Sequence, residues 1–132
     1  HTACIYPRRL EAVLPLCDWV GFDIKAPFKA YRKITGIDNS GDPARSCMEA
    51  IIASGVEHEC RTTLHPALLS MSEVEDLAAT LADAGVRNYA LQAFRAPGCA
   101  DQALATAAPM PVDAGAVARI AARFERFTLR QS

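Results

Sequence analysis

The feature that most limits the fold of this chain is an alternation of strand-like and helix-like segments joined by short connections. Residues 19–25, 56–64 and 88–94 have the period-two alternation of side chains expected of β-strands. Helical patterns separate them. A helical connection is typical of parallel strands, whereas a tight hairpin joins antiparallel strands. The sequence therefore predicts an α/β fold, with parallel strands adjacent in chain order and helices on the convex face of the sheet.

The predicted helices are placed by their apolar stripes and by residues typical of helix ends. They cover residues 7–14, 29–34, 42–55 and 72–85, followed by a last helix that Asp113 caps, and residues 128–130 are expected to form a closing strand. Asp42 is predicted to cap the third helix, and Ser72 with Glu75 to form a capping box on the fourth. A closed eight-stranded barrel takes about 250 residues. We therefore expect residues 1–132 to be a single domain with an open parallel sheet or a partial barrel.

Composition narrows the class of protein. The chain has 132 residues, 51% of them hydrophobic, and a net charge of -1, which gives no argument for binding nucleic acid or a membrane surface. No apolar run is long enough for a transmembrane helix, and the start does not resemble a signal peptide. The five cysteines include no Cys-x-x-Cys pair, so neither a disulfide framework nor a zinc site is indicated. These observations favour a cytoplasmic protein with reduced cysteines.

Polar side chains occupy one face of each predicted strand. Val20, Phe22 and Ile24 share one face of the first strand, whereas Asp23 and Lys25 share the other, and Pro27 is expected to end it. The simplest interpretation of these two charges is a solvated ion pair at a strand end.

The second and third strands repeat this pattern. Glu59, Arg61 and Thr63 alternate along one face of the second strand, and Gln92 and Phe94 along one face of the third. If these faces converge, they form a pocket with cations for an anionic group and a carboxylate for an ammonium or a metal ion. The amide and the aromatic ring suit a planar ring system. Such a pocket fits a nucleoside-bearing amino acid better than a bare phosphate.

Two common classes of site have little support. Neither G-x-G-x-x-G nor G-x-x-x-x-G-K-[ST] occurs, so no glycine-rich phosphate loop is present. No serine lies in a G-x-S-x-G elbow. We interpret His58 as a core or edge residue and His65 as a loop residue, and we predict no catalytic side chain in this chain.

The order of several motifs resembles a known family. The motifs are His1-Thr2-Ala3-Cys4, Asp18-Trp19-Val20-Gly21-Phe22-Asp23-Ile24-Lys25-Ala26-Pro27, Tyr31-Arg32-Lys33-Ile34-Thr35-Gly36, Glu59-Cys60-Arg61-Thr62-Thr63 and Leu91-Gln92-Ala93-Phe94-Arg95. Together they resemble the C-terminal half of radical S-adenosylmethionine (SAM) enzymes, specifically the activating proteins of anaerobic ribonucleoside-triphosphate reductase. The resemblance covers nearly the whole chain.

The resemblance implies a fold, a chemistry and a partner. The fold would be the C-terminal part of a (β/α)6 barrel that holds a [4Fe-4S] cluster and SAM. Family members cleave SAM reductively to a 5′-deoxyadenosyl radical, which abstracts hydrogen from a glycine of the partner, a glycyl-radical enzyme. By motif, the cofactor-binding residues would be Thr2, Asp23, Lys25, Arg61, Thr63, Gln92, Phe94 and Arg95. Thr2 would lie near the methionyl end, where Asp23 would also hold a monovalent cation, and Gln92, Phe94 and Arg95 near the adenine.

The chain departs from the family pattern in two places. The Cys-x-x-x-Cys-x-x-Cys cluster loop and the Gly-Gly-Glu strand do not occur, and His1-Thr2-Ala3-Cys4 stands where the family has Asp-Thr-Asn-Gly. We therefore expect the cluster-binding part to lie upstream, outside this chain, and no metal ligands within it. The chain alone is expected to be inactive, to expose a strand edge at Thr2–Ile5 and to self-associate through it. The alternative is a non-redox α/β module that binds a nucleotide-like ligand or a protein.

Overall fold

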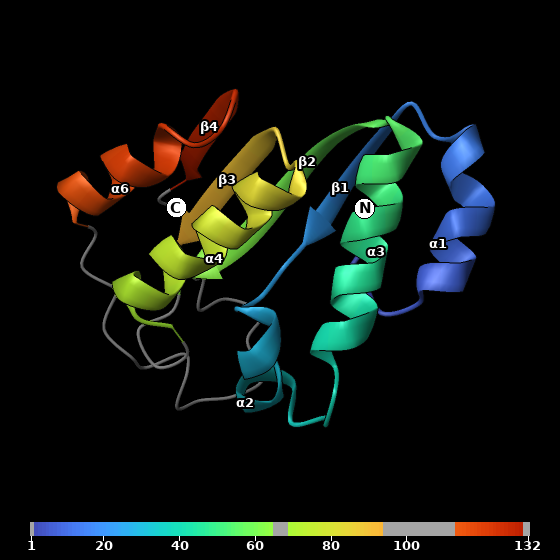
Figure 1. Ribbon diagram of the computed structural model, residues 1–132, viewed down its shortest axis with the longest axis horizontal. Helices are drawn as coiled ribbons and strands as arrows, with labels where there is room; N and C mark the ends of the chain where they lie inside the picture. Colours follow the sequence, from blue (N-terminus) through green and yellow to red (C-terminus); the bar gives the residue numbers. More distant parts are fainter. Residues whose placement is uncertain (1, 65–68, 94–112, 131–132) are drawn as a thin grey trace.

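One parallel sheet organises the fold. The computed structural model describes residues 2–64, 69–93 and 113–130. Its strands are β1 (Trp19–Asp23), β2 (Glu57–Leu64), β3 (Asn88–Ala93) and β4 (Arg126–Arg130). They lie in the order β1-β2-β3-β4, and each neighbouring pair is parallel (Figure 1). The predicted α/β class and the parallel pairing in chain order are confirmed.

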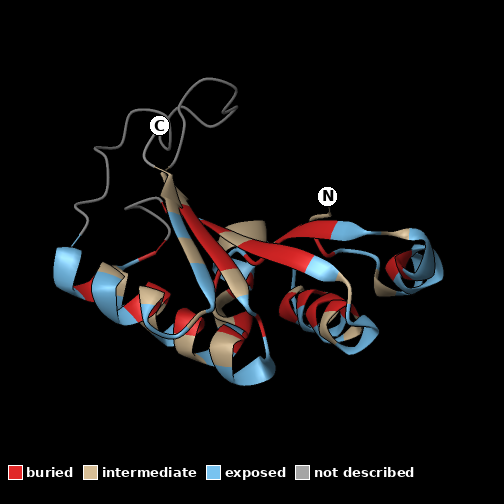
Figure 2. Ribbon diagram, turned by 90° about the horizontal axis from the view of Figure 1, so that it is seen from above, coloured by how far each residue is buried: buried red, intermediate tan, exposed pale blue. Residues whose placement is uncertain are grey.

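Helices connect the strands and cover one face of the sheet (Figure 2). In chain order they are α1 (Pro7–Val13), the 3-10 turns η1 (Leu14–Leu16) and η2 (Phe28–Ala30), α2 (Arg32–Thr35), α3 (Gly41–Ser54), α4 (Met71–Ala84) and α6 (Ala114–Ala121). α3 packs beside α1, and α4 beside α6. Among the described residues, no helix has the length and apolar character needed to span a membrane.

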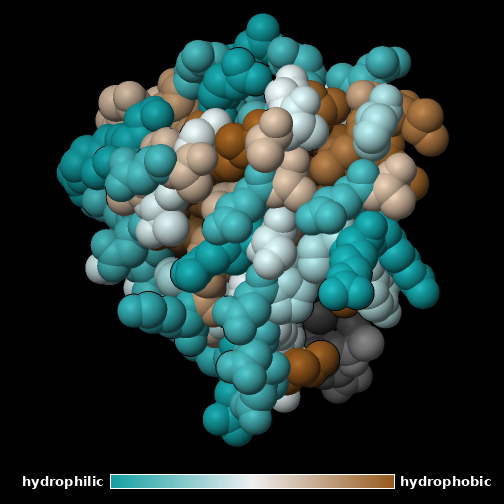
Figure 3. Space-filling model, turned by 45° about the vertical axis from the view of Figure 1, so that its right-hand side comes forward, coloured by the Kyte–Doolittle hydropathy of each residue, from teal (hydrophilic) through white to brown (hydrophobic). Residues whose placement is uncertain are grey.

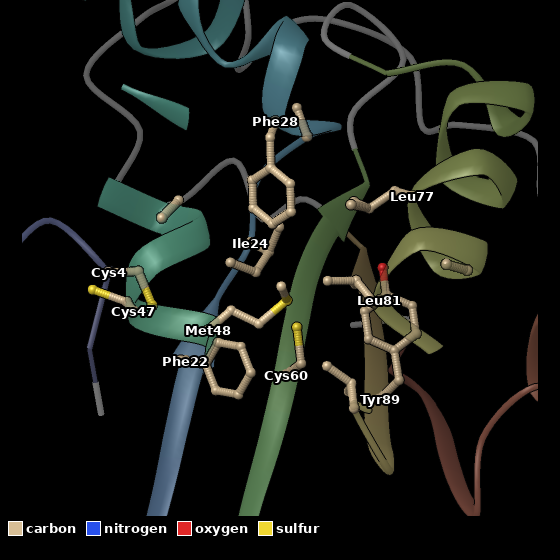
Figure 4. Packing of buried hydrophobic residues seen from close by; sticks show 14 of the residues in the cluster. Cys4, Phe22, Ile24, Phe28, Cys47, Met48, Cys60, Leu77, Leu81 and Tyr89 are labelled. Atoms are coloured by element: carbon tan, nitrogen blue, oxygen red, sulfur yellow. The ribbon is translucent and has the colours of Figure 1, made fainter. Parts of the chain in front are cut away.

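The hydrophobic core lies between the sheet and these helices (Figure 4). The strands contribute Phe22, Cys60, Tyr89 and Leu91, the segment after β1 contributes Ile24, and the helices contribute Met48, Ile51, Leu77, Leu81 and Ile120, all at most 2% exposed. Two buried hydroxyls link β3, β2 and the residue that follows β1. Tyr89 donates to Oγ1 of Thr62 (2.7 Å), and Thr62 donates to the carbonyl of Ile24 (2.7 Å). Each buried hydroxyl thus has a partner, as burial requires.

Two predicted helix starts are wrong by one or two residues. α3 begins at Gly41, after Ser40, rather than after an Asp42 cap. Gly41 packs so tightly on η2 that a Cβ there would lie 2.1 Å from the carbonyl oxygen of Phe28. α4 begins at Met71, and its capping box joins Ser70 to Glu73 rather than Ser72 to Glu75. Both pairs have the Ser-x-x-Glu spacing, so the pattern alone could not choose between them.

Strand and turn boundaries also differ from the prediction. β1 ends at Asp23, so Lys25 lies beyond the strand. The segment predicted as helical over residues 29–34 divides into η2 and α2. β4 covers five residues rather than three, and it continues the alternation of Phe127 and Leu129 with polar neighbours. Phe94 and Arg95 lie outside the described residues.

Candidate functional site

The strand residues that point away from the core-facing side chains form one predominantly polar surface, which we call the polar face. Its members are Trp19, Gly21, Asp23, Glu57, Glu59, Arg61, Thr63, Asn88, Ala90, Gln92, Arg126, Thr128 and Arg130. In parallel pairs, aligned residues share a face. The register aligns Asp23 with Arg61, and Thr63 with Gln92. The predicted site residues of β1, β2 and β3 therefore lie together on one surface.

Thr2 lies beside β1 next to these residues. Its N–H donates to the carbonyl of Gly21 (2.8 Å), and its carbonyl accepts from the N–H of Asp23 (3.1 Å). This makes a parallel bridge between Thr2 and Phe22. The Thr2 hydroxyl accepts a further bond from the N–H of Cys4 (3.1 Å), a residue with a positive φ of 58°. The backbone thus holds Thr2 against the end of β1. Because the bridge aligns Thr2 with Phe22, the Thr2 side chain shares the core-facing side of the sheet rather than the polar face.

Asp23 has an unusual electrostatic environment. Partial burial raises the pKa of its carboxyl, and the positive charges of Arg61 and Lys25 lower it, with a net rise above the ordinary value of 3.8. Lys25 is exposed, and its backbone N–H donates to the hydroxyl of the buried Tyr31 (2.8 Å). A half-buried carboxylate facing two cations can bind an ammonium or a cation and can orient an anion-binding guanidinium.

Glu59 lies at the centre of the polar face and binds two arginines. Its Oε1 accepts from Nε of Arg61 (2.7 Å) and from Nη1 of Arg130 (2.9 Å), and its Oε2 accepts from Nη2 of Arg130 (3.1 Å). The Arg130 bonds and then the Arg61 bond lower the pKa of Glu59, whereas partial burial opposes this. The Arg61 guanidinium also lies 5.6 Å from the centre of the Trp19 ring, within cation–π range.

Thr63 on β2 and Gln92 on β3 are the other predicted site residues among those described. Nε2 of Gln92 donates to Oγ1 of Thr63 at 3.3 Å, so these two side chains meet on the polar face. Arg130 and Trp19 were not predicted as site residues. Their position in period-two segments was the available signal, because it places both on the same face as Arg61.

His58 has a structural environment, as predicted. It is 5% exposed, and its Nδ1 lies 3.2 Å from the carbonyl of Val56. Its Nε2 accepts from the N–H of Arg87 (3.2 Å). Both ring nitrogens are therefore used by the backbone.

The cysteines offer no metal site in the part of the chain that the structure describes. Cys4, Cys17, Cys47 and Cys60 are free thiols, and burial raises the pKa of Cys4, Cys47 and Cys60. Metal binding needs thiolates. Within the described residues, no three side chains of Cys, His, Asp or Glu converge as metal ligands would.

Two hollows lie away from the polar face or at its margin. One, of about 600 Å³, lies where α3 begins and is lined in part by Arg32, Asp38 and Arg45; Arg32 pairs there with Asp38 at 2.7 Å. It contains no predicted site residue. The other, of about 340 Å³, lies between α1 and the outer edge of β1.

Exposed hydrophobic side chains gather around this second hollow. We call them the edge patch: Ile5, Tyr6, Val13, Leu16 and Trp19, which are 47–85% exposed. Figure 3, which brings the α1 side forward, shows a mainly hydrophilic surface with hydrophobic areas gathered toward its upper edge. Such a cluster is a feature of interaction surfaces. Of the strand expected over Thr2–Ile5, only the isolated bridge at Thr2 forms, and the predicted self-association remains a prediction.

Comparison with known proteins gives one partial similarity. No protein-family model matches the chain. A Methanocaldococcus jannaschii protein whose provisional name is glycyl-radical enzyme activating enzyme is 29% identical over 103 residues. The match covers 74% of this chain and 42% of that protein, so the chain spans less than half the length of this relative. The chain is thus distantly similar to part of an activating enzyme of glycyl-radical enzymes.

Proposed function

We propose that the polar face is the SAM-binding surface of a radical SAM enzyme that activates a glycyl-radical enzyme. The observation that carries this proposal is the pairing of Asp23 with Arg61 on adjacent strands, with Thr2 held beside them. A carboxylate and a guanidinium at one strand end complement the charged amino-acid portion of SAM. The distant similarity to a glycyl-radical enzyme activating enzyme supports the same class of chemistry.

Each predicted residue has a role in this proposal. Asp23 attracts the ammonium or the sulfonium of SAM, while Lys25 and Arg61 bind its carboxylate. Thr2 holds the end of β1 through its backbone bonds beside the methionyl end, and Thr63 with Gln92 forms a hydrogen-bonding surface toward the nucleoside. Phe94 and Arg95 follow directly after β3 in sequence, and we propose that they approach the adenine.

The residues described here fit SAM but do not fit an iron-sulfur cluster. The buried thiols have raised pKa values and do not converge with other ligands within the described residues. We therefore propose that ligands for a [4Fe-4S] cluster lie outside the described residues. SAM held by these residues would supply the 5′-deoxyadenosyl group for hydrogen abstraction from a glycine of the partner, provided that the cluster delivers one electron to the sulfonium.

The finer assignments follow from the motif order. We propose a partial (β/α)6 barrel, to which this chain contributes its C-terminal strands, and an anaerobic ribonucleotide reductase as the partner. The four described cysteines are free thiols, which suits a reducing cytoplasm.

The direct test is equilibrium binding of SAM and of 5′-methylthioadenosine to the 132-residue chain by calorimetry. The two ligands share the nucleoside, but only SAM has the charged amino-acid portion. We expect SAM to bind more tightly, and Lys25→Met and Arg61→Met each to weaken SAM binding by about tenfold while leaving methylthioadenosine binding unchanged. Arg126→Met is the matched control, because Arg126 is an exposed arginine elsewhere on the polar face.

Two outcomes separate this proposal from its alternative. Equal affinity for the two ligands, or no binding of either, would favour the non-redox module. With dithionite and after anaerobic iron-sulfur reconstitution, the chain alone is expected to form no 5′-deoxyadenosine above the protein-free blank. Production of 5′-deoxyadenosine would show that cluster ligands are present within this chain.

A further inference from the structure

Glu59 is the most enclosed charged residue of the polar face. It is 7% exposed although it lies on the side of the sheet opposite to the described helices. A carboxylate at this depth is stable only when it is paired and hydrogen-bonded. Its aligned neighbour on β1 is small, and so is the β3 residue one pair further along the polar face. Gly21 aligns with Glu59 on β1, and Ala90 aligns with Arg61 on β3.

Arg130 reaches Glu59 from two strands away. β3 lies between β2 and β4, so the Arg130 side chain crosses β3 to make its two bonds of 2.9 and 3.1 Å. The methyl group of Ala90 leaves room for this crossing, and Ala90 is 0% exposed. This bidentate pair fixes both oxygens of Glu59, which is the geometry that gives an arginine–carboxylate contact its directionality.

Arg61 is held between Glu59 and Trp19. Glu59 accepts from Nε of Arg61 at 2.7 Å, and the Trp19 ring lies 5.6 Å from the guanidinium carbon. The Trp19 ring in turn lies over Gly21, since a Cβ at position 21 would be 2.7 Å from Cη2 of Trp19. The arrangement therefore depends on the glycine, and it restricts a long side chain that otherwise has many rotamers.

We propose that Glu59 is a positioning residue that holds the Arg61 guanidinium beside Asp23, with Arg130 fixing Glu59 and Trp19 supporting Arg61. This inference rests on the proposed function only for the identity of the ligand that Arg61 meets. On the polar face Arg61 binds Glu59 of its own strand and aligns with Asp23 of β1. Its positive charge therefore lies between two carboxylates. Preorganising Arg61 in this way reduces the entropy lost when it binds an anionic group.

Trp19 is a built-in reporter of this arrangement, because it is the single tryptophan of the chain. The test measures Trp19 emission and its quenching by acrylamide, without ligand, in the unaltered chain, Glu59→Gln, Arg61→Met and Glu57→Gln. We expect Glu59→Gln to change emission and quenching in the same direction as Arg61→Met. Glu57→Gln should change neither, although Glu57 aligns directly with Trp19.

Glu59→Asp guards against a folding defect in Glu59→Gln. It retains the carboxylate, so it should recover much of the original Trp19 signal if charge and hydrogen bonding hold Arg61 in place. Circular dichroism checks that each variant is folded. A Trp19 signal in folded Glu59→Gln that equals that of the unaltered chain would overturn the inference.

Ligand binding supplies the second readout. Glu59→Gln is expected to weaken SAM binding by about tenfold without changing 5′-methylthioadenosine binding. If the unaltered chain binds no SAM, the proposed function fails, while the fluorescence result still decides whether Glu59 positions Arg61. If the unaltered chain binds SAM and Glu59→Gln binds it equally well, the positioning role is refuted.

Discussion

Two carboxylates on one sheet face are expected to affect stability in opposite directions. Neutralising Glu59 as Glu59→Gln removes the negative charge that Arg61 and Arg130 share, and it replaces one of the two accepting oxygens by an NH2 group that cannot accept from an arginine. Neutralising Asp23 as Asp23→Asn removes a charge that partial burial disfavours. The first change should destabilise the fold at neutral pH, and the second should stabilise it.

The magnitudes follow from the contacts. Net contributions of hydrogen bonds to charged groups are about 1.5–3 kcal/mol, but the side chains of Arg61 and Arg130 are 23% and 39% exposed, so water replaces part of what is lost. We expect Glu59→Gln to lower the free energy of unfolding by roughly 1–3 kcal/mol, or about 4–10 °C in Tm for a domain of this size. Asp23→Asn should raise the free energy of unfolding by roughly 0.5–1 kcal/mol, because it removes a charge that burial disfavours.

The pH dependence gives an independent check of the signs. The pKa of Glu59 is lower in the folded protein than its ordinary value of 4.5. Its stabilising effect is therefore complete above that value and is lost as pH falls through the folded pKa. The pKa of Asp23 is raised above 3.8. Its destabilising effect is present at neutral pH and disappears as pH falls through the folded pKa and then the ordinary value.

Urea unfolding of both variants at pH 7 and in steps down to pH 3.5 measures these differences, with Glu57→Gln as the exposed control on the same strand. Both differences from the unaltered chain should shrink toward acid. A stabilised Glu59→Gln, a destabilised Asp23→Asn, or differences that do not change with pH would each refute the reasoning.

Three further outcomes are expected. Gly41→Ala should lower the free energy of unfolding by about 2–4 kcal/mol, because its Cβ would lie 2.1 Å from a backbone oxygen that cannot move aside; Gly115→Ala, in a helix with no close backbone neighbour, should change it by less than about 1 kcal/mol. Thr62→Val should cost more stability in thermal unfolding than Tyr89→Phe, since it leaves two buried partners unsatisfied rather than one. Sedimentation of the chain at high micromolar concentration should show self-association through the edge patch, and a strictly monomeric chain that binds no apolar dye would contradict it.

The sheet was predictable because its signals are local. Alternation in residues 19–25 and 56–64 fixes which side chains share a face, and intervening helices require parallel neighbours. These two rules place Asp23 and Arg61 on neighbouring parallel strands, and the register that aligns them is known from the structure. The helix starts were less predictable. Ser70 and Ser72 both have a glutamate three residues later, and tertiary packing decides between them.

The contact between Glu59 and Arg130 could not be predicted in the same way. It joins residues 71 positions apart and depends on the strand order, on the small side chain of Ala90 and on the exact twist that brings β4 toward β2. Alternation in residues 126–130 places Arg130 on the polar face, but it does not say which carboxylate Arg130 meets. The sequence therefore predicts the composition of the site better than its connections.

The contacts of Glu59 with Arg61 and Arg130 favour a binding surface over a solvated ion pair. Parallel sheets are usually covered on both faces and have continuous apolar strands, whereas one face of β2 has a polar residue at every position. An exposed ion pair would contribute little and would need no particular neighbours. Glu59 instead is buried, binds arginines from two strands and aligns with Gly21, while Trp19 on the same face remains 47% exposed. Polar groups that are held this firmly beside an exposed aromatic ring are better explained by a ligand that meets this face than by contact with water alone.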